Sequence, residues 1–205
     1  MSGVGGRQAS DLSSFLRAAA VDRPAQPAYI FADGAIRFDE LDQQSELCAR
    51  GLAALGIERG DRVALLVRPS QPLFVLTFGL LRRGAVPVLI DPGIGRVHLA
   101  RCLAEARPSA FIGVSVAHAA RVLLGWAKDS VRTLVTVGGR WFWGGASFDD
   151  VMKAGALAKP GLLPSPGPNE LAAIAFTSGS TGPPKGAVYT HETLAAQALL
   201  LRDHF

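Results

Sequence analysis

The sequence of 205 residues has few cysteines and no long apolar run. Its two cysteines, Cys48 and Cys102, lie in helix-like segments without a CxxC partner, so we expect both to be small buried apolar side chains. No run approaches the ~18 apolar residues of a membrane-spanning helix, and residues 1–20 lack the basic-then-apolar pattern of a secretion signal. These absences predict a cytoplasmic protein without a transmembrane segment.

Clustered basic residues are also absent. The net charge is +4 and the isoelectric point is near 9.5, but lysines and arginines are scattered singly, with Arg82-Arg83 the only adjacent pair. Nucleic-acid binding normally needs a basic tract or stripe, so we expect a solvated basic surface and no nucleic-acid partner. The 49% of hydrophobic residues instead predicts a compact fold with a large core.

Hydrophobic periodicity predicts an α/β fold. A short helix over 11–20 is expected behind a Ser10 cap, then a hairpin with its turn at Asp33-Gly34, then a helix that Asp39 caps and Gly56 ends. Four further strands are predicted at 62–67, 85–90, 110–113 and 133–137. Helices are predicted between them at 72–83, 96–106 and 116–127, with Gly84 as a stop signal.

Continuous β-rich runs that alternate with helices are typical of a mostly parallel sheet covered by helices on both faces. The segment 159–169 holds four prolines and two glycines, which predicts a linker. We therefore expect an α/β portion over 1–158, a linker over 159–169, and a strand–loop–strand unit with the start of a helix over 170–205.

The unit over 170–205 contains the segment TSGSTGPPKG, residues 177–186, between two predicted strands at 171–176 and 187–190. Glycines 179, 182 and 186 permit backbone angles that turn successive N–H groups inward, and Ser178, Ser180 and Thr181 add hydroxyl donors. Lys185 supplies a positive charge for the β- and γ-phosphates of a nucleotide and for departing pyrophosphate. The segment predicts a polyphosphate-binding loop.

Two other interpretations of this loop fit less well. A flexible Gly/Ser linker normally lacks a lysine behind two prolines and is not flanked by strands this hydrophobic. A Walker-type loop needs lysine directly after its second glycine, whereas Pro183 and Pro184 follow Gly182.

The segment TSGSTGPPKG closely resembles the TSG[ST]TGxPKG signature of the adenylate-forming superfamily, which includes acyl-CoA synthetases, luciferases and peptide-synthetase adenylation domains. GDRVALLV at 60–67, GLLRRGAVPV at 79–88 and IDPG at 90–93 resemble the family's first strands and helices. Residues 91–95, 110–113 and RWFWGG at 140–145 are most similar to fatty-acyl ligase-like members, including the β-lactone synthetases of bacterial olefin biosynthesis.

The resemblance implies an incomplete N-terminal portion of the large domain of such an enzyme. It implies that ATP, bound with Mg²⁺, reacts with a small carboxylic acid, a fatty or 3-hydroxy fatty acid, to give an acyl-adenylate and pyrophosphate. Coenzyme A or a carrier thiol then accepts the acyl group; in the β-lactone branch the 3-hydroxyl of a 2-alkyl-3-hydroxy acid closes the ring. A non-catalytic nucleotide-binding remnant is the alternative from another class.

Carried over by position, the phosphate-binding residues are Thr177, Ser178, Gly179, Ser180, Thr181, Gly182, Lys185 and Gly186, with Thr181 and Lys185 as the catalytic candidates. The family's aromatic-Gly-x-Thr-Glu segment, ribose-binding aspartate, hinge and C-terminal catalytic lysine have no counterpart in these residues, and neither do the magnesium ligands. The residues alone are thus expected to be nearly inactive and to expose apolar surface.

The remaining candidate residues are expected to be structural. His98 and His118 have no acidic or cysteine partner at metal-ligand spacing, which favours solvated or core positions. His191 is expected to begin a helix after the second loop strand. The aromatic cluster Trp141, Phe142 and Trp143 is expected to pack in a hairpin or loop, with an acyl chain or a membrane surface as the alternatives.

Overall fold

The computed structural model describes residues 11–32, 34–159, 161, 165–177 and 184–204. The helices are α1 (Leu12–Asp22), α2 (Phe38–Ala54), α3 (Gln71–Arg83), α4 (Arg96–Ala106), α5 (Ser115–Leu124), α6 (Phe148–Leu157) and α7 (His191–His204), with a 3-10 turn, η1, at Pro92–Ile94. The strands are β1 (Pro27–Phe31), β2 (Gly34–Arg37), β3 (Arg62–Leu66), β4 (Val86–Ile90), β5 (Ala110–Val114), β6 (Thr133–Val137), β7 (Ala146–Ser147), β8 (Leu171–Thr177) and β9 (Lys185–Thr190).

Seven strands form one sheet in the order β7-β6-β5-β3-β4-β8-β9. All neighbours are parallel except β8 and β9, which pair antiparallel at one edge. The predicted α/β fold with a mostly parallel sheet is thus confirmed. The strands β1 and β2 form a separate antiparallel hairpin, as predicted, although Asp33 of its turn lies outside the described residues.

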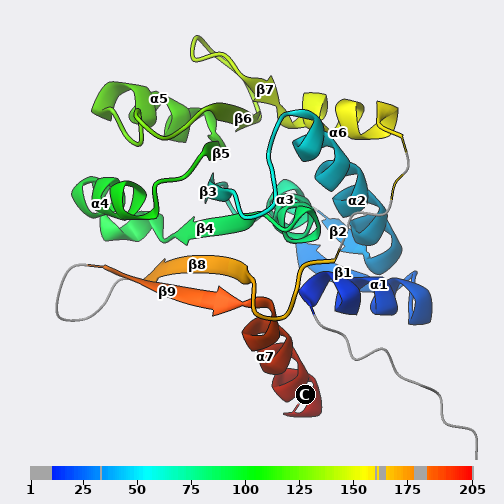
Figure 1. Cartoon of the computed structure of the whole chain (residues 1–205). Coiled ribbons are helices and arrows are strands. Elements are labelled where there is room, and N and C mark those ends of the chain that lie inside the picture. Colours follow the sequence, from blue (N-terminus) through cyan, green and yellow to red (C-terminus); the bar gives the residue numbers. More distant parts are fainter. Residues whose placement is uncertain (1–10, 33, 160, 162–164, 178–183, 205) are drawn as a thin grey trace, which may run out of the picture.

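Helices cover both faces of the sheet, as Figure 1 shows, with α2, α3 and α6 on one side and α4 and α5 on the other. Alternating side chains of β3 explain this arrangement, because successive strand residues point to opposite faces. Val63 and Leu65 are buried in the core beneath α1, α2, α3 and α6, whereas Ala64 is buried in the core beneath α4. No helix in the described part of the chain is long and apolar enough to cross a bilayer.

Two helix caps differ from the predictions. The cap of α1 is Asp11 and not Ser10, because the Asp11 carboxylate accepts the backbone N–H of Ser14 at 3.0 Å; Ser10 lies outside the described residues. The helix α2 begins at Phe38, so Asp39 lies in its first turn, and the Glu40 carboxylate accepts the N–H of the cap residue Arg37 at 3.0 Å. The Asp11 carboxylate thus satisfies a free N–H of the first turn of α1, and the Glu40 carboxylate satisfies the N–H of the residue that caps α2.

The sequence analysis missed β7 and α6. The helix α6 starts with a capping box in which the Ser147 hydroxyl accepts the N–H of Asp150 while the Asp150 carboxylate accepts the N–H of Ser147. This Ser-x-x-Asp pattern is a helix-start signal that was present in the sequence. The proposed division at 159–169 stays a prediction, and residues 160 and 162–164 of that segment lie outside the described residues.

Arg82 is not part of a solvated basic surface. Its side chain is 3% exposed and forms an ion pair with Asp42 of α2, with Glu46 3.8 Å away. Charges this far from water are stable only when paired, so the Arg82–Asp42 pair fixes how α3 packs on α2. Arg83, its neighbour, instead donates from its Nε to the Ile57 carbonyl at 2.9 Å.

Replacing Asp42 with asparagine is expected to lower the free energy of unfolding by about 3 kcal/mol, because the buried Arg82 cation loses its main partner. Adding Arg82→Met to that variant is expected to recover part of the loss, since no unpaired charge then remains buried. Urea unfolding followed by circular dichroism measures both. Glu46→Gln, which removes only a 46% exposed partner, is the control and should cost less than about 0.5 kcal/mol. Equal losses for Asp42→Asn and Glu46→Gln would contradict the prediction.

Candidate phosphate-binding site

The predicted phosphate loop joins β8 to β9 at one edge of the sheet. Residues 178–183, which include Ser178, Gly179, Ser180, Thr181 and Gly182, lie outside the described residues. The described ends of the segment are strand residues: Thr177 closes β8 opposite Lys185, the first residue of β9, and Phe176 pairs with Gly186. The second strand thus begins two residues earlier than predicted.

Gly186 is a strand residue whose missing side chain has a packing role. A Cβ atom at this position would lie 2.9 Å from the ring of Phe176, which is itself buried in the core. The predicted part of Gly186 in phosphate binding stays a prediction, and the contact with Phe176 is a second reason for glycine at this position. Because glycine has no side chain, the Phe176 ring can pack directly against the backbone of β9 at this position.

The hairpin places Thr177 and Lys185 at the carboxyl edge of the sheet. The parallel strands β3, β4, β5, β6 and β8 all end at this edge, which is where open α/β sheets bind their ligands. Asp91, directly after β4, donates its backbone N–H to the Phe176 carbonyl at 3.5 Å, so the end of β4 lies beside the end of β8. Thr177 and Lys185 therefore lie at the edge where such sheets usually bind ligands.

The described side chains of the site fit a polyphosphate. Thr177 and Lys185 are both exposed, and no described carboxylate lies within ion-pair distance of Lys185. An exposed hydroxyl next to an unpaired ammonium group offers a donor and a charge to phosphate oxygens. Among the described residues no group of three or more His, Cys, Asp or Glu side chains is arranged to bind a metal ion.

An ion pair anchors the other end of β8. Glu170 precedes β8, and its carboxylate binds the guanidinium of Arg59 through two contacts, one of them 2.7 Å from Arg59 Nε to Glu170 Oε2. Glu170 also accepts the N–H of Gly167 at 2.7 Å, and its carbonyl accepts the N–H of His191 at 3.0 Å. These hydrogen bonds, mainly the one from Arg59 and then the one from the Gly167 N–H, lower the pKa of Glu170 from 4.5 to about 2. The sequence analysis missed this contact, because 111 residues separate its partners.

This ion pair should make stability depend on pH in the acid range. A carboxylate whose pKa falls on folding stabilises the protein above its unfolded pKa, so the contribution is complete above pH 4.5 and is lost as pH falls to about 2. Because both side chains are more than a third exposed, solvent screening limits the effect to about 1 kcal/mol or less. Chemical unfolding of Glu170→Gln should differ from the parent at pH 7 and match it near pH 2. A constant difference across that range would argue against the ion pair.

Two of the histidines, His191 and His118, are buried in the described structure. His191 begins α7 as predicted and is 1% exposed, and burial lowers the pKa of its imidazole. His118 is fully buried, and its Nε2 lies 2.9 Å from the Val135 carbonyl; burial also lowers its pKa. We predicted that His118 is either solvated or part of the core, and its burial confirms that it is part of the core. Neither ring reaches solvent as a catalytic base would need to.

The aromatic cluster divides into one packed and two exposed residues. Trp143 donates from Nε1 to the Thr136 hydroxyl at 2.9 Å and stacks on His118, with the ring centroids 5.3 Å apart. Trp141 and Phe142 are 58% and 72% exposed. The prediction that the cluster packs is therefore right for Trp143, which contacts β6 and α5, and wrong for its two exposed neighbours.

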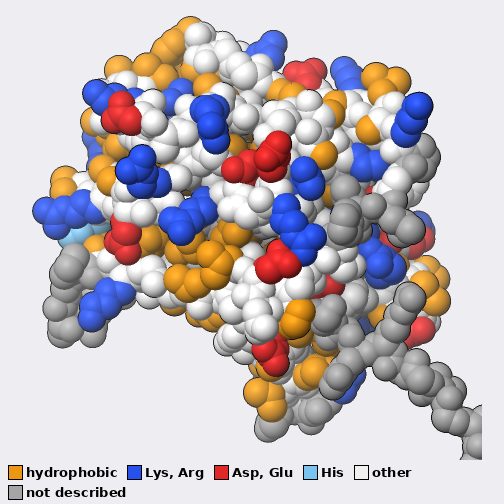
Figure 2. Space-filling model, in the orientation of Figure 1, with side chains coloured by type: hydrophobic (Ala, Val, Ile, Leu, Met, Phe, Trp, Pro, Cys, Tyr) orange, Lys and Arg blue, Asp and Glu red, His pale blue; other side chains and the backbone are white. Residues whose placement is uncertain are grey.

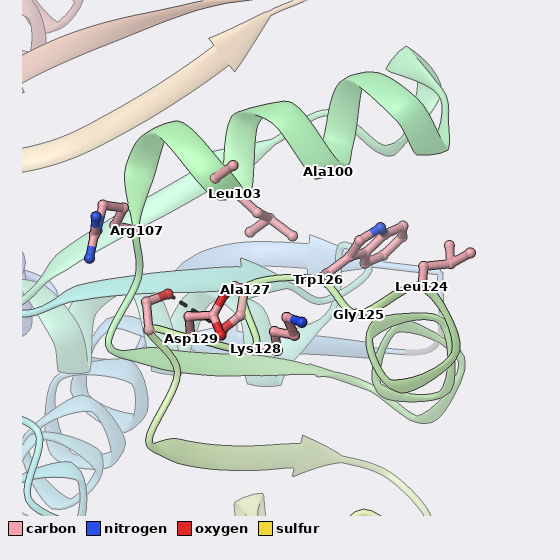
Figure 3. Close-up of a pocket in the computed structure, with 11 residues that line it drawn as sticks. Ala100, Leu103, Arg107, Leu124, Gly125, Trp126, Ala127, Lys128 and Asp129 are labelled. Atoms are coloured by element: carbon pink, nitrogen blue, oxygen red, sulfur yellow. Dashed lines mark hydrogen bonds between the residues drawn. The ribbon is translucent and has the colours of Figure 1, made fainter.

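A cavity of about 300 Å³ lies between α4 and residues 124–130, and Figure 3 shows Leu103 of α4 facing the segment that carries Trp126 and Lys128. Arg107 precedes β5 and the segment 124–130 precedes β6, so the cavity lies at the amino ends of these strands. It is therefore on the opposite edge of the sheet from Thr177 and Lys185 and is separate from the candidate phosphate-binding site.

Comparisons with known proteins agree with the fold. The sequence model of the AMP-binding enzyme family matches residues 16–205. Two curated relatives named olefin beta-lactone synthetase, from Stenotrophomonas maltophilia and Xanthomonas campestris, are each 49% identical over 173 residues. That match covers 84% of this chain and 31% of each relative, so the chain spans about a third of their length. A solved long-chain-fatty-acid-CoA ligase from Archaeoglobus fulgidus superposes with a TM-score of 0.79 at 26% identity, covering 93% of this chain and 39% of the ligase.

Proposed function

Because the chain belongs to the AMP-binding enzyme family, we propose that it carries the ATP-phosphate-binding part of an enzyme that activates a carboxylic acid and closes it to a β-lactone. The observation that carries the proposal is the 49% identity to two olefin beta-lactone synthetases over most of the chain. The predicted resemblance to the adenylate-forming superfamily is confirmed by the family match.

In the proposed reaction, a carboxylate oxygen of the acid attacks the α-phosphorus of ATP, and pyrophosphate leaves. The oxygen of a 3-hydroxyl group on the same acid then attacks the activated acyl carbon, AMP leaves with the electron pair, and the hydroxyl proton is released. The described residues contribute to the first step: Lys185 and the Thr177 hydroxyl hold the β- and γ-phosphates and stabilise charge on departing pyrophosphate. Ser178, Ser180 and Thr181 are proposed as further phosphate ligands. Mg²⁺ bound with ATP would neutralise phosphate charge, through ligands outside these residues.

A second candidate ends in a thioester. The fold neighbour named a long-chain-fatty-acid-CoA ligase favours transfer of the acyl group to the thiol of coenzyme A after the same adenylation step. Both candidates share the phosphate-binding site, because they differ only in the nucleophile that attacks the acyl carbon. A non-catalytic nucleotide-binding protein is the third candidate.

The test uses the protein from the complete reading frame with ATP, Mg²⁺ and a 2-alkyl-3-hydroxy fatty acid, analysed by mass spectrometry. A product lighter than the acid by one water, formed without coenzyme A, supports the lactone. The matched acid without the 3-hydroxyl should still release pyrophosphate but give no lactone. A product that needs coenzyme A selects the ligase, and absence of acid-dependent pyrophosphate release selects the non-catalytic protein.

A further inference from the structure

Two backbone hydrogen bonds close the base of the hairpin formed by β8 and β9. The His191 N–H donates to the Glu170 carbonyl at 3.0 Å, and the Glu192 N–H donates to the Pro168 carbonyl at 2.9 Å. The donors begin α7, directly after β9, and the acceptors lie in the segment that enters β8. The junction of β9 and α7 is therefore tied to the start of β8.

The register of β9 along β8 decides where Lys185 lies. At the tip of the hairpin Lys185 pairs with Thr177. At its base Thr190 pairs with Leu171, where the ladder is irregular. A slip of one residue would turn every side chain of β9 to the other face of the sheet. The residues of β9 are exposed or half-buried, and Figure 2 shows hydrophobic side chains at the surface over β8 and β9. The first buried side chain after β9 is that of His191, which is 1% exposed.

The imidazole of His191 is enclosed without a hydrogen-bond partner. Both ring nitrogens, Nδ1 and Nε2, are buried, and neither forms a hydrogen bond within the part of the chain that the structure describes. Burial without a partner is much less costly for a neutral ring than for a charged one. A segment packed onto the outside of this region would not contact the enclosed ring, so the same surroundings are expected in a longer protein.

Charged groups near the ring come from three parts of the chain. Glu170 lies before β8 and is already paired with Arg59, from the segment between α2 and β3. Asp11 at the start of α1 is 2% exposed, and its carboxylate already accepts two hydrogen bonds from the first turn of that helix. The strand β8 has no ionisable side chain, and Glu192 of α7 is exposed. A proton added to the ring of His191 would therefore create a buried cation without a direct partner.

Burial is the main influence on the protonation of this ring. It lowers the pKa of His191 from 6.5, whereas Asp11 and Glu170 raise that pKa and Arg59 lowers it. A histidine whose pKa falls on folding stabilises the folded form fully above its unfolded pKa of 6.5, and this stabilisation is lost as pH falls through the lowered folded pKa. Glu170 stays ionised in this range, because its own pKa is about 2.

We propose that His191 is a positioning residue: its neutral, buried ring anchors the junction of β9 and α7 and thereby keeps Lys185 opposite Thr177. Protonation of the ring favours opening of this junction, so the anchor weakens below pH 6.5. The link to phosphate binding rests on the proposed function, whereas the anchoring of the strand does not.

Hydrogen exchange followed by mass spectrometry tests the anchor in the protein from the complete reading frame, without nucleotide. After correction for intrinsic exchange rates, the opening of residues 185–192 should increase about tenfold for each pH unit below 6.5, until the pKa of the folded form is reached. The reason is that the open junction binds a proton that the closed junction excludes. His191→Leu, whose side chain carries no charge, should keep the segment protected at about pH 7.5 and remove the pH dependence. If that variant does not fold, His191→Gln is the uncharged replacement.

His118→Gln is the matched control. His118 is also buried with a lowered pKa, but its ring contacts the Val135 carbonyl of β6, so its replacement should leave the pH response of residues 185–192 unchanged. Residues 62–66 of β3 are the internal reference. Opening that does not depend on pH, a pH dependence that persists in His191→Leu, or an equal response in residues 62–66 would each overturn the proposal.

ATP tests the link to the phosphates. If the open junction cannot hold phosphate, ATP at 100 times its dissociation constant should reduce the opening of residues 185–192 about a hundredfold. Equal opening with and without bound ATP would show that the junction does not position Lys185, and would overturn that part of the proposal. Calorimetry shows separately whether ATP binds at all, so failure of the proposed function is distinguished from failure of the anchor.

Discussion

Replacing Lys185 with alanine is expected to lower acid-dependent pyrophosphate release by two to three orders of magnitude in the protein from the complete reading frame. The physical reason is the position of the charge: Lys185 begins β9 opposite Thr177, at the edge where the phosphates would lie, and no described carboxylate neutralises it. Removing one preorganised group that stabilises developing negative charge typically costs about 10²–10³ in rate. Exchange of labelled pyrophosphate into ATP measures the loss directly.

Two controls separate this chemistry from stability. Lys185 is exposed, so Lys185→Ala should change the free energy of unfolding by less than about 0.5 kcal/mol. Lys153→Ala removes another exposed lysine, on α6, and should leave the exchange rate unchanged. Lys185→Arg keeps the charge and should retain part of the activity, because the guanidinium is larger and differently shaped. A Lys185→Ala rate within threefold of the parent would remove Lys185 from the proposed mechanism.

Most of the fold was predictable because its signals are local. The buried strands β3, β4, β5 and β6 are short β-rich runs, and Gly56 and Gly84 end their helices with the positive φ angles expected at those positions, +80° and +72°. The ion pairs were not predictable. Arg82 and Asp42 are forty residues apart, and which arginine is buried depends on how α3 crosses α2. Tertiary packing decides such pairs, and no sequence period encodes them.

The site was predictable in its residue types and only partly in its geometry. Lys185 and Gly186 were assigned to a loop because the signature motif is continuous, yet the antiparallel register extends β9 back to Lys185. The motif gave no sign that Gly186 faces Phe176, since that contact crosses between two strands. Trp141 and Phe142 were expected to pack because aromatic residues usually do, but exposure depends on the neighbouring elements, and only Trp143 meets α5.

Adding a single methyl group at Gly51 is expected to destabilise the protein strongly. Gly51 of α2 faces α6, and a Cβ atom there would lie 1.9 Å from the Val151 carbonyl oxygen; a Cβ at Gly155 of α6 would lie 1.9 Å from the Leu47 carbonyl oxygen. Both obstacles are backbone atoms, so the two helices must separate. We expect Gly51→Ala and Gly155→Ala each to cost about 3 kcal/mol even after the gain in helix propensity, which lowers the melting temperature by about 6–12 °C.

Gly79 supplies the matched comparison, because it also lies in a helix but faces a side chain. A Cβ atom at Gly79 would lie 2.8 Å from the sulfur of Cys48, which can be removed. Gly79→Ala should therefore cost less than Gly51→Ala, and adding Cys48→Ala should recover part of its loss, whereas no single side-chain truncation should rescue Gly51→Ala. Calorimetry of the four variants measures the order. If Gly51→Ala melted at or above the parent temperature, the helices α2 and α6 would not be in the close backbone contact that orients α6 along the sheet.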